Sequence, residues 1–391
     1  MEISIKSNPF TPKSGMEPKV FLGREKELKV FEKQLRKASQ SIYNHFLILG
    51  DWGIGKTTLL KEYKKIAQLQ NILAAYVPVR EFIERELLSA TIHLITQITR
   101  SLPIRFEKLR GFREYLNGLG ITLPVIGGGI TFAEGKTYQG DPQVLLLDAL
   151  TKLWKELKRE TDTVIVLLDD VQSYQVIPEF LTLLRNVLSY EEIVRDTGFL
   201  FILASTYQGW AQFMQKSHPI GRYFIPIVRL KNLGNEKTME ILDKTLEDTG
   251  VIFEETVKKR VFKYTEGHPF QMQVLCDYLY ENQVEGKVCD EVWEIAFTMT
   301  LEDLGEIILD HLYSSASSAE REILDIMAKE YKLWRLMELF DEIRRMRGTI
   351  ENKGTLGKSL ERLVEKDLVT KLERGSYRLP NRIFSEYLLR R

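Results

Sequence analysis

The sequence predicts an α/β fold: a core with a parallel sheet, then a helical domain, then a small domain of helices and a hairpin. Three observations support this prediction. Short apolar segments alternate with amphipathic helical stretches over about 46–228, which is typical of a parallel sheet with crossover helices. Residues 233–300 read as helices throughout, and 301–391 as helices followed by two short strands around Gly375. The expected domains are 1–232 with an insertion at about 102–140, 233–300, and 301–391.

A glycine-rich loop between a short apolar segment and a helix is the central feature of the core. The apolar segment is 45–49, and the loop matches the pattern G-x-x-x-x-G-K-[ST]. Glycines with positive φ let successive backbone N–H groups surround a polyphosphate. Lys56 supplies charge to the β- and γ-phosphates, and the hydroxyl of Thr57 can bind Mg²⁺. The predicted nucleotide contacts are Gly50, Asp51, Trp52, Gly53, Ile54, Gly55, Lys56, Thr57 and Thr58.

Two carboxylates follow a second apolar segment. Residues 164–168 are apolar and lead into Asp169 and Asp170, as in a buried parallel strand whose carboxyl end carries chemistry. Such a pair is also ordinary turn chemistry, but its position after the loop favours a catalytic pair. We expect Asp169 to bind Mg²⁺ together with Thr57, and Asp170 to orient or deprotonate the attacking water.

The next strand and the connection after it supply two further candidates. The segment 198–204 leads to Ser205, whose hydroxyl either contacts the γ-phosphate or the attacking water, or caps the following element. Arg222 precedes 223–228, which we predict to be an edge strand because it contains a proline. Arg222 is either a surface ion-pair residue or a finger that reaches the γ-phosphate of its own or a neighbouring subunit.

The insertion interrupts the alternation of strands and helices. Prolines and a run of glycines punctuate it, and its first part is rich in basic residues. It is either a surface excursion or an element that contacts a partner or DNA. The basic residues are Arg105, Lys108, Arg110 and Arg113.

Composition narrows the class of protein. Lys plus Arg and Asp plus Glu both number 55, so no overall positive charge argues for nucleic acid and any such binding needs a local patch. Only Cys276 and Cys289 are present, which indicates neither a disulfide framework nor a zinc site and fits a reducing cytoplasm. No uncharged apolar run is long enough to span a membrane. We therefore predict a soluble, cytoplasmic protein without membrane contact.

The two last domains are predicted from helical spacing and from the hairpin. Helices are expected at about 235–249, 253–265, 269–281 and 288–299, with Pro269 in a first turn, as is common at helix starts. The order of helices and hairpin after residue 301 suggests a winged helix. On its presumed recognition helix, Lys358, Arg362 and Lys366 are four residues apart and share a face. That face either contacts DNA or is a solvated face of a protein-binding domain.

Several of these motifs together resemble a known family. They are Asn8-Pro9-Phe10, Phe21-Leu22-Gly23-Arg24, the loop at 50–57, Asp169-Asp170, Ser205, Gly221-Arg222, Gly267-His268-Pro269 and the winged tail. In these the chain resembles the archaeal-type AAA+ and STAND ATPases, a group similar to the archaeal origin-recognition initiators. The resemblance implies ATP or ADP as nucleotide, Mg²⁺ as metal, and a helical lid and winged helix that move relative to the core. It also implies that Phe21 and Arg24 cover the adenine and ribose and that Pro269 contacts adenine.

Two positions depart from the family pattern. Initiator-type relatives place an arginine soon after the lid glycine, where this chain has Phe270. Sensing of the γ-phosphate from the lid is then weak or lost, as in STAND-type switches. The second acid is Asp170 where many AAA+ enzymes have Glu, and the shorter side chain suggests slow turnover.

The leading functional prediction is an ATPase switch that acts in a DNA transaction through its winged helix. The alternative is a STAND-type signalling or scaffold switch that hydrolyses ATP slowly and presents the winged helix to a protein partner. A third hypothesis is self-association into a ring or filament around DNA, in which Arg222 acts in trans.

Overall fold

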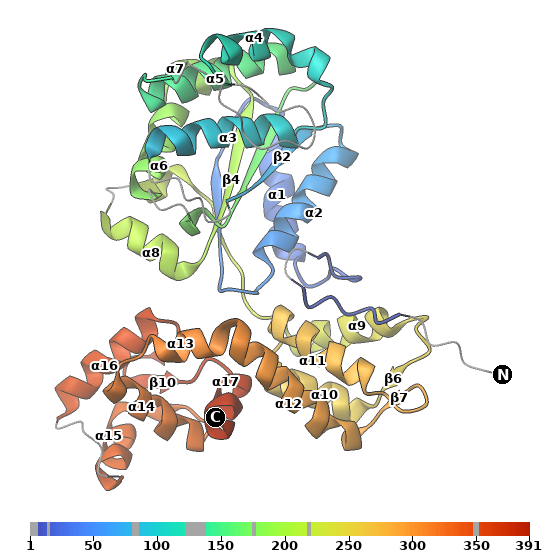
Figure 1. Ribbon diagram of the computed structural model, residues 1–391, viewed down its shortest axis with the longest axis vertical. Helices are drawn as coiled ribbons and strands as arrows, with labels where there is room; N and C mark the ends of the chain where they lie inside the picture. Colours follow the sequence, from blue (N-terminus) through green and yellow to red (C-terminus); the bar gives the residue numbers. More distant parts are fainter. Residues whose placement is uncertain are drawn as a thin grey trace. The chain divides into compact units, whose positions relative to one another are not determined.

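The computed structural model describes residues 7–13, 16–79, 86–121, 138–173, 177–216, 220–346 and 352–391. The chain divides into two compact units, each described here by itself (Figure 1). The sheet unit is Arg24–Lys231, and the helical unit is Met1–Gly23 with Asn232–Arg391.

A five-stranded parallel sheet forms the centre of the sheet unit (Figure 1). Its strand order is β2-β3-β4-β1-β5, so β4 lies between β1 and β3. Every residue of β1, β3 and β4 is buried, which explains why these strands read as continuous apolar runs. The strands are β1 (Phe46–Leu49), β2 (Leu73–Pro78), β3 (Val164–Asp169), β4 (Phe199–Ser205) and β5 (Ile227–Arg229).

Helices that follow the strands cover the sheet. Asp141 caps α5, because its carboxylate accepts from the backbone N–H groups of Gln143 and Val144 at 2.7 and 3.1 Å. The helices are α1 (Glu25–Ala38), α2 (Lys56–Leu69), α3 (Leu87–Ser101), α4 (Arg110–Gly118), α5 (Pro142–Leu157), α6 (Ile177–Leu188), α7 (Glu191–Asp196) and α8 (Tyr207–Lys216).

The insertion and the edge strand differ from the sequence expectation. Within the insertion, α4 packs against α5 and buries Phe112 and Leu116, so one face of this part belongs to the core, while Arg105, Lys108 and Arg110 are exposed. Residues 122–137 lie outside the described residues. The strand expected at 223–228 is shorter and begins only at Ile227, because a 3₁₀ turn, Ile220–Tyr223, precedes it. β5 is an edge strand, as Pro226, which directly precedes it, indicated.

The first half of the helical unit contains the predicted lid helices. The helix expected at 288–299 begins later, because β7 and a 3₁₀ turn occupy its first residues. β6 and β7 form a two-residue parallel pair that sequence periodicity did not indicate. The elements are α9 (Asn235–Leu246), β6 (Ile252–Phe253), α10 (Glu255–Thr265), α11 (Pro269–Glu281), β7 (Lys287–Val288), α12 (Trp293–Leu304), a π-helical turn (Gly305–Leu309) and α13 (Asp310–Ser314).

The N-terminal stretch packs with the helical unit. The side-chain amide of Asn8 donates to Asp277 Oδ1 at 3.0 Å and to Glu281 Oε1 at 2.7 Å, both on α11. The ring of Phe10 is buried and stacks on Phe253. The motif Asn8-Pro9-Phe10 therefore anchors the chain start to the lid helices.

The second half of the helical unit has the winged-helix arrangement of three helices and a three-stranded antiparallel sheet with order β8-β10-β9. A terminal helix packs against the first of these helices, since Ser385 Oγ donates to the carbonyl of Ala328 at 3.0 Å. The elements are α14 (Ser318–Lys329), β8 (Trp334–Arg335), α15 (Leu336–Arg345), α16 (Lys353–Glu365), β9 (Thr370–Glu373), β10 (Ser376–Arg378) and α17 (Arg382–Arg390).

Among the helices of the described residues, none combines the length and apolar character that crossing a membrane needs.

Candidate nucleotide site

The glycine-rich loop, the two carboxylates and Ser205 meet where β1, β3 and β4 end. Leu49, the last residue of β1, pairs with Ser205, the last residue of β4. The backbone N–H of Gly50 donates to the carbonyl of Ser205 at 3.3 Å. Because β4 separates β1 from β3, the tip of β4 lies between the glycine-rich loop and the two carboxylates. This edge, at the carboxyl ends of parallel strands, is where such sheets bind ligands.

The loop from Gly50 to Gly55 has the backbone that its glycines permit. Gly53 and Gly55 have φ of 73° and 99°, in the left-handed region that disfavours side chains. Gly55 directly precedes α2, so the first N–H groups of that helix follow the loop. At Gly50 a Cβ atom would come within 2.6 Å of Ile54 and 3.1 Å of Leu230, so only glycine fits there.

Lys56 lies folded over this loop. Its ammonium group donates to the carbonyls of Gly50 and Asp51, both at 3.0 Å, and the side chain is 6% exposed. Burial lowers the pKa of Lys56, which means that the site disfavours an uncompensated ammonium charge. An anion held by the loop would supply the missing charge.

Thr57 and Asp169 are in direct contact. The hydroxyl of Thr57 donates to Asp169 Oδ2 at 2.6 Å, and the phenol of Tyr76 on β2 donates to the same oxygen at 2.7 Å. Burial raises the pKa of Asp169, and the neighbouring charge of Asp170 adds to this. A cation beside Asp169 would offset both effects.

Two polar atoms at this edge are buried and have no hydrogen-bond partner within the described ranges. They are Asp169 Oδ1 and Ser205 Oγ. A buried polar atom without a partner costs free energy, so each favours a ligand that bonds it. Carboxylate and hydroxyl oxygens are ligands that Mg²⁺ prefers, and Thr57 and Asp169 therefore fit a magnesium ion next to a phosphate.

Asp170 is held by a residue that the sequence analysis did not single out. Its φ of 54° lies in the left-handed region, and its Oδ1 accepts from the side-chain amide of Gln172 at 3.1 Å. The other end of the Gln172 amide accepts from the backbone N–H of Thr206 at 3.3 Å. Gln172 thus links the tip of β3 to the tip of β4.

The sequence analysis did not identify Tyr76 either, because only the pairing of β2 with β3 brings it to Asp169.

Arg24 braces the back of the loop. Its buried guanidinium donates to the carbonyls of Ile54 and Lys231, both at 2.8 Å. Its donors bind the protein backbone, and the predicted contact of Arg24 with the ribose stays a prediction.

The remaining predicted nucleotide contacts fall into two groups. Asp51 and Trp52 are exposed on the loop, and Thr58 is half-buried in the first turn of α2. Phe21 and Pro269 belong to the helical unit, where Pro269 is the first residue of α11 after the cap His268. Their contacts with adenine stay predictions.

Arg222 lies at the opposite end of the sheet from the loop. It is exposed and lines the same groove as Phe199, the first residue of β4, whereas Ser205 at the other end of β4 touches the loop. A seven-residue strand places its ends about 20 Å apart. One side chain does not span that distance, so Arg222 cannot contact a phosphate held by its own loop.

The three predicted DNA contacts on α16 differ in what they bind. Lys366 Nζ lies 2.7 Å from Glu320 Oε2, and Arg362 Nε lies 3.8 Å from Glu320 Oε1. Glu320 is buried and also accepts from the backbone N–H of Ser317 at 2.8 Å as part of the capping box of α14. Lys358 is exposed, and within the described residues its side chain has no ion pair. Lys366 is thus bound within the protein, whereas Arg362 forms a longer ion pair and its side chain is 56% exposed.

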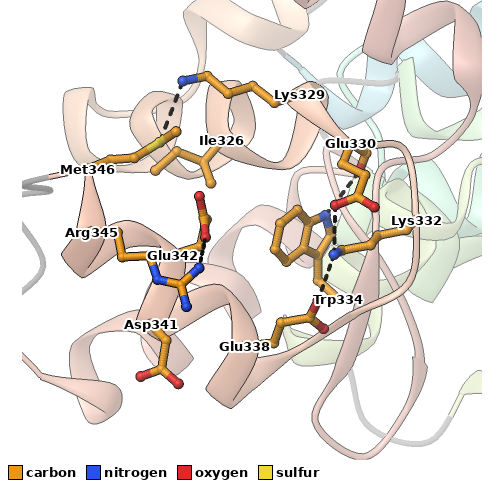
Figure 2. Close-up of a pocket in the computed structure, with 10 residues that line it drawn as sticks. All are labelled: Ile326, Lys329, Glu330, Lys332, Trp334, Glu338, Asp341, Glu342, Arg345 and Met346. Carbon is orange, nitrogen blue, oxygen red and sulfur yellow. Dashed lines mark hydrogen bonds and ion pairs between the residues drawn. The ribbon is translucent and has the colours of Figure 1, made fainter.

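A pocket of about 530 Å³ lies between α14, α15 and the segment before β8 (Figure 2). Lys332 lies 4.1 Å from the centre of the Trp334 ring and forms ion pairs with Glu330 and Glu338 at 2.7 and 2.6 Å (Figure 2). Arg345 likewise pairs with Glu342 at 3.1 Å. The charged groups of this pocket therefore largely neutralise one another.

Comparison with known proteins agrees with this geometry. A family model described as an ATPase domain predominantly from Archaea matches residues 21–275, a span that includes the loop and both carboxylates. The chain is similar to a Walker-type ATPase of Pyrococcus abyssi, with a TM-score of 0.61, 17% identity and 100% of each chain covered. It is also similar to the ORC2 protein of Aeropyrum pernix, solved as ADPNP-ADP complexes, with a TM-score of 0.62, 17% identity and 97% of each chain covered. A search of curated proteins found no match.

Proposed function

Because the chain belongs to the family of ATPase domains found predominantly in Archaea, we propose that it is a Mg²⁺-dependent ATP switch that acts in a DNA transaction. One observation supports this best: the hydroxyl of Thr57, in the first turn after the loop, meets the carboxylate of Asp169 from a strand 112 residues away. A contact that served only to stabilise the fold would be expected to leave no buried carboxylate oxygen unpaired. Asp169 Oδ1, however, has no hydrogen-bond partner in the described part of the site, which favours a bound ligand there.

Each residue of the site has a role in this proposal. The loop N–H groups and Lys56 bind the β- and γ-phosphates, while Thr57 and Asp169 hold Mg²⁺. The metal ion, when bound, neutralises charge on these phosphates. Asp170, kept in place by Gln172, orients or deprotonates the attacking water, and Ser205 donates a hydrogen bond on the γ-phosphate side.

Arg222 serves a neighbouring subunit in this proposal. The length of β4 places it too far from its own loop, and its guanidinium is exposed beside the ring of Tyr223. A guanidinium that reaches another subunit's γ-phosphate stabilises the charge that develops during transfer. Mixing Lys56→Ala with Arg222→Ala protein tests this. Each variant alone should be nearly inactive, the mixture should recover part of the turnover, and no recovery would refute the role in trans.

DNA binding in this proposal rests on the winged-helix arrangement and on the exposed cation Lys358 of α16. The second candidate is a switch with a protein partner, and the internal ion pairs of Arg362 and Lys366 favour it. A steep loss of affinity with salt is expected for DNA, because phosphate contacts release counterions.

One experiment separates the two candidates. ATP turnover of the full chain is measured with and without duplex DNA across a salt series, with Asp170→Ala as the blank. DNA-stimulated turnover that disappears as salt rises supports a DNA transaction. Turnover that is indifferent to DNA at low salt supports the protein-binding switch, and turnover equal to the blank would overturn the catalytic assignment of Asp170.

A further inference from the structure

A groove of about 940 Å³ runs along the end of the sheet unit opposite the nucleotide loop. It is lined by the last turns of α1, the segment before β1, the end of α6, and the residues that precede β5. These are the amino ends of the strands, so this groove is separate from the candidate nucleotide site.

The charged residues that line the groove are all basic. Lys33 and Lys37 lie one turn apart on α1, and Arg222 lies near the start of β5. Within the described residues, none of the three forms an ion pair with a carboxylate. His45 also lines the groove, but burial lowers its pKa to about 4, so it adds no charge at neutral pH. The groove therefore favours an acidic partner.

The groove also exposes apolar side chains. Ile42 is 50% exposed, Ile225 56% and Tyr223 36%. Large apolar side chains clustered in one groove are typical of a surface that binds another protein, not of a surface that stays exposed to solvent. A partner for this groove should thus combine carboxylates with apolar side chains.

The helical unit carries a surface with those properties. Ile295 and Met299 on α12 are 57% and 38% exposed, and Glu302 and Glu306 follow on the same side, Glu306 in the π-helical turn. The spacing of these four residues, i, i+4, i+7 and i+11, places them along one stripe of a helix. Neither Glu302 nor Glu306 forms an ion pair within the described residues.

The two surfaces match in spacing as well as in charge. Lys33 and Lys37 are four residues apart on α1, and so are Glu302 and Glu306 along α12 and the π-helical turn that continues it, so the members of each pair lie about a helical turn apart. We infer that the basic groove of one copy binds the acidic α12 stripe of a second copy, with Glu302 and Glu306 against Lys33 and Lys37 and with Ile295 and Met299 against the apolar floor. Such a contact is head-to-tail, so it continues into a ring or a filament.

Charge reversal tests this inference with the full chain, in the absence of nucleotide, so that the result does not depend on the ATP site. Wild-type protein should self-associate in sedimentation runs up to about 100 µM at low salt. Lys33→Glu with Lys37→Glu, and separately Glu302→Lys with Glu306→Lys, should each weaken association about tenfold or more. An equal mixture of the two double variants should associate as wild type does, because both reversed surfaces then meet complementary charge.

A matched control changes net charge equally at another surface. Lys329→Glu with Lys353→Glu, both exposed in the winged-helix half, should leave association within about twofold of wild type. Melting curves of all variants exclude misfolding as the cause. A wild type that stays monomeric up to about 100 µM, a double variant that associates as wild type does, or a mixture that fails to recover would each overturn the inference.

Discussion

The sequence predicted ligand contacts both at the loop end of the sheet and on the presumed recognition helix of the winged domain, yet the two regions differ in how their polar side chains are used. At the sheet, Asp169 Oδ1 and Ser205 Oγ are buried without a hydrogen-bond partner in the described part of the chain. In the winged domain, Lys366 at the C-cap of α16 bonds the buried Glu320 Oε2, and Arg362 lies 3.8 Å from Glu320 Oε1, which is also without a hydrogen bond in the described part of the chain. Open bonding capacity at the ligand-binding edge of the sheet points to a ligand, whereas the charge of Lys366 is used inside the protein and points to stability.

The largest effect should follow from removing the charge at the loop. Lys56→Ala removes the charge-assisted contacts to the phosphates, so we expect ATP binding to weaken by about 3 kcal/mol, or roughly 100-fold. Burial of the ammonium disfavours its charge in the protein alone, so the melting temperature without ATP should change little. Calorimetric titration with ATP measures the affinity. Lys65→Ala, at an exposed position of α2, is the control and should bind ATP normally.

For Glu320 we expect a loss of stability without a loss of ATP affinity. Glu320→Gln removes the charge that Lys366 and Arg362 neutralise, and because both cations can regain water we expect the helical unit to lose about 2 kcal/mol of unfolding free energy. ATP binding should stay unchanged. Asp341→Asn is the control, since Asp341 is exposed and forms no ion pair within the described residues. Equal stability of Glu320→Gln and wild type in urea would contradict the structural role.

The same variant gives a pH test. Burial pulls the pKa of Glu320 up, but hydrogen bonds from Lys366 and the backbone of Ser317 outweigh it and hold the pKa below its ordinary 4.5. The ionised carboxylate thus stabilises the fold above about pH 4.5, and this contribution disappears as the pH falls through the lowered pKa. The difference in unfolding free energy between wild type and Glu320→Gln should therefore become smaller as the pH falls below about 4.5.

Much of the sheet unit was predictable because its signals are local. The loop motif, its flanking strand and helix, and the cap at Asp141 are each defined within a few consecutive residues. Helix α4 was missed although Leu109, Phe112 and Leu116 are buried at helical spacing, because nearby prolines and glycines made the segment resemble a loop.

The rest of the site depends on contacts between distant residues. The position of β4 between β1 and β3 is a matter of strand order, and it determines that Ser205 lies beside Gly50. Tyr76 reaches Asp169 only through strand pairing, and Glu320 meets Lys366 across 46 residues. Helical spacing placed Lys358 and Arg362 on one helix, with Lys366 at its C-cap, but it carried no information on the carboxylate that pairs with Arg362 and Lys366.

A smaller effect is expected when the hydrogen bond that holds Asp169 at the sheet edge is removed. Tyr76→Phe removes one hydrogen bond to Asp169 Oδ2, so we expect the gain in ADP affinity that Mg²⁺ brings to fall by about 1 kcal/mol, or roughly fivefold. Affinity measured in EDTA should not change. Tyr63→Phe is matched, because its buried hydroxyl donates to the carbonyl of Glu27 at 2.9 Å on the side of α1. Should both variants lower the Mg²⁺-dependent gain equally, Tyr76 would have no specific role in holding Asp169.

The smallest effect is expected for Lys358, the exposed cation of α16, which should affect DNA binding where the paired Lys366 affects stability. Lys358 is the member of the predicted set whose charge stays available, so Lys358→Ala should reduce the slope of log affinity for duplex DNA against log salt by about 1 and leave stability unchanged. Lys366→Ala should instead lower stability, because it removes the 2.7 Å ion pair with Glu320. Fluorescence anisotropy across a salt series, together with melting curves, measures both quantities. If Lys358→Ala leaves the slope unchanged while Lys366→Ala reduces it in a folded protein, then ion pairing inside the winged helix does not decide which residues contact DNA, and the contrast between the two regions fails.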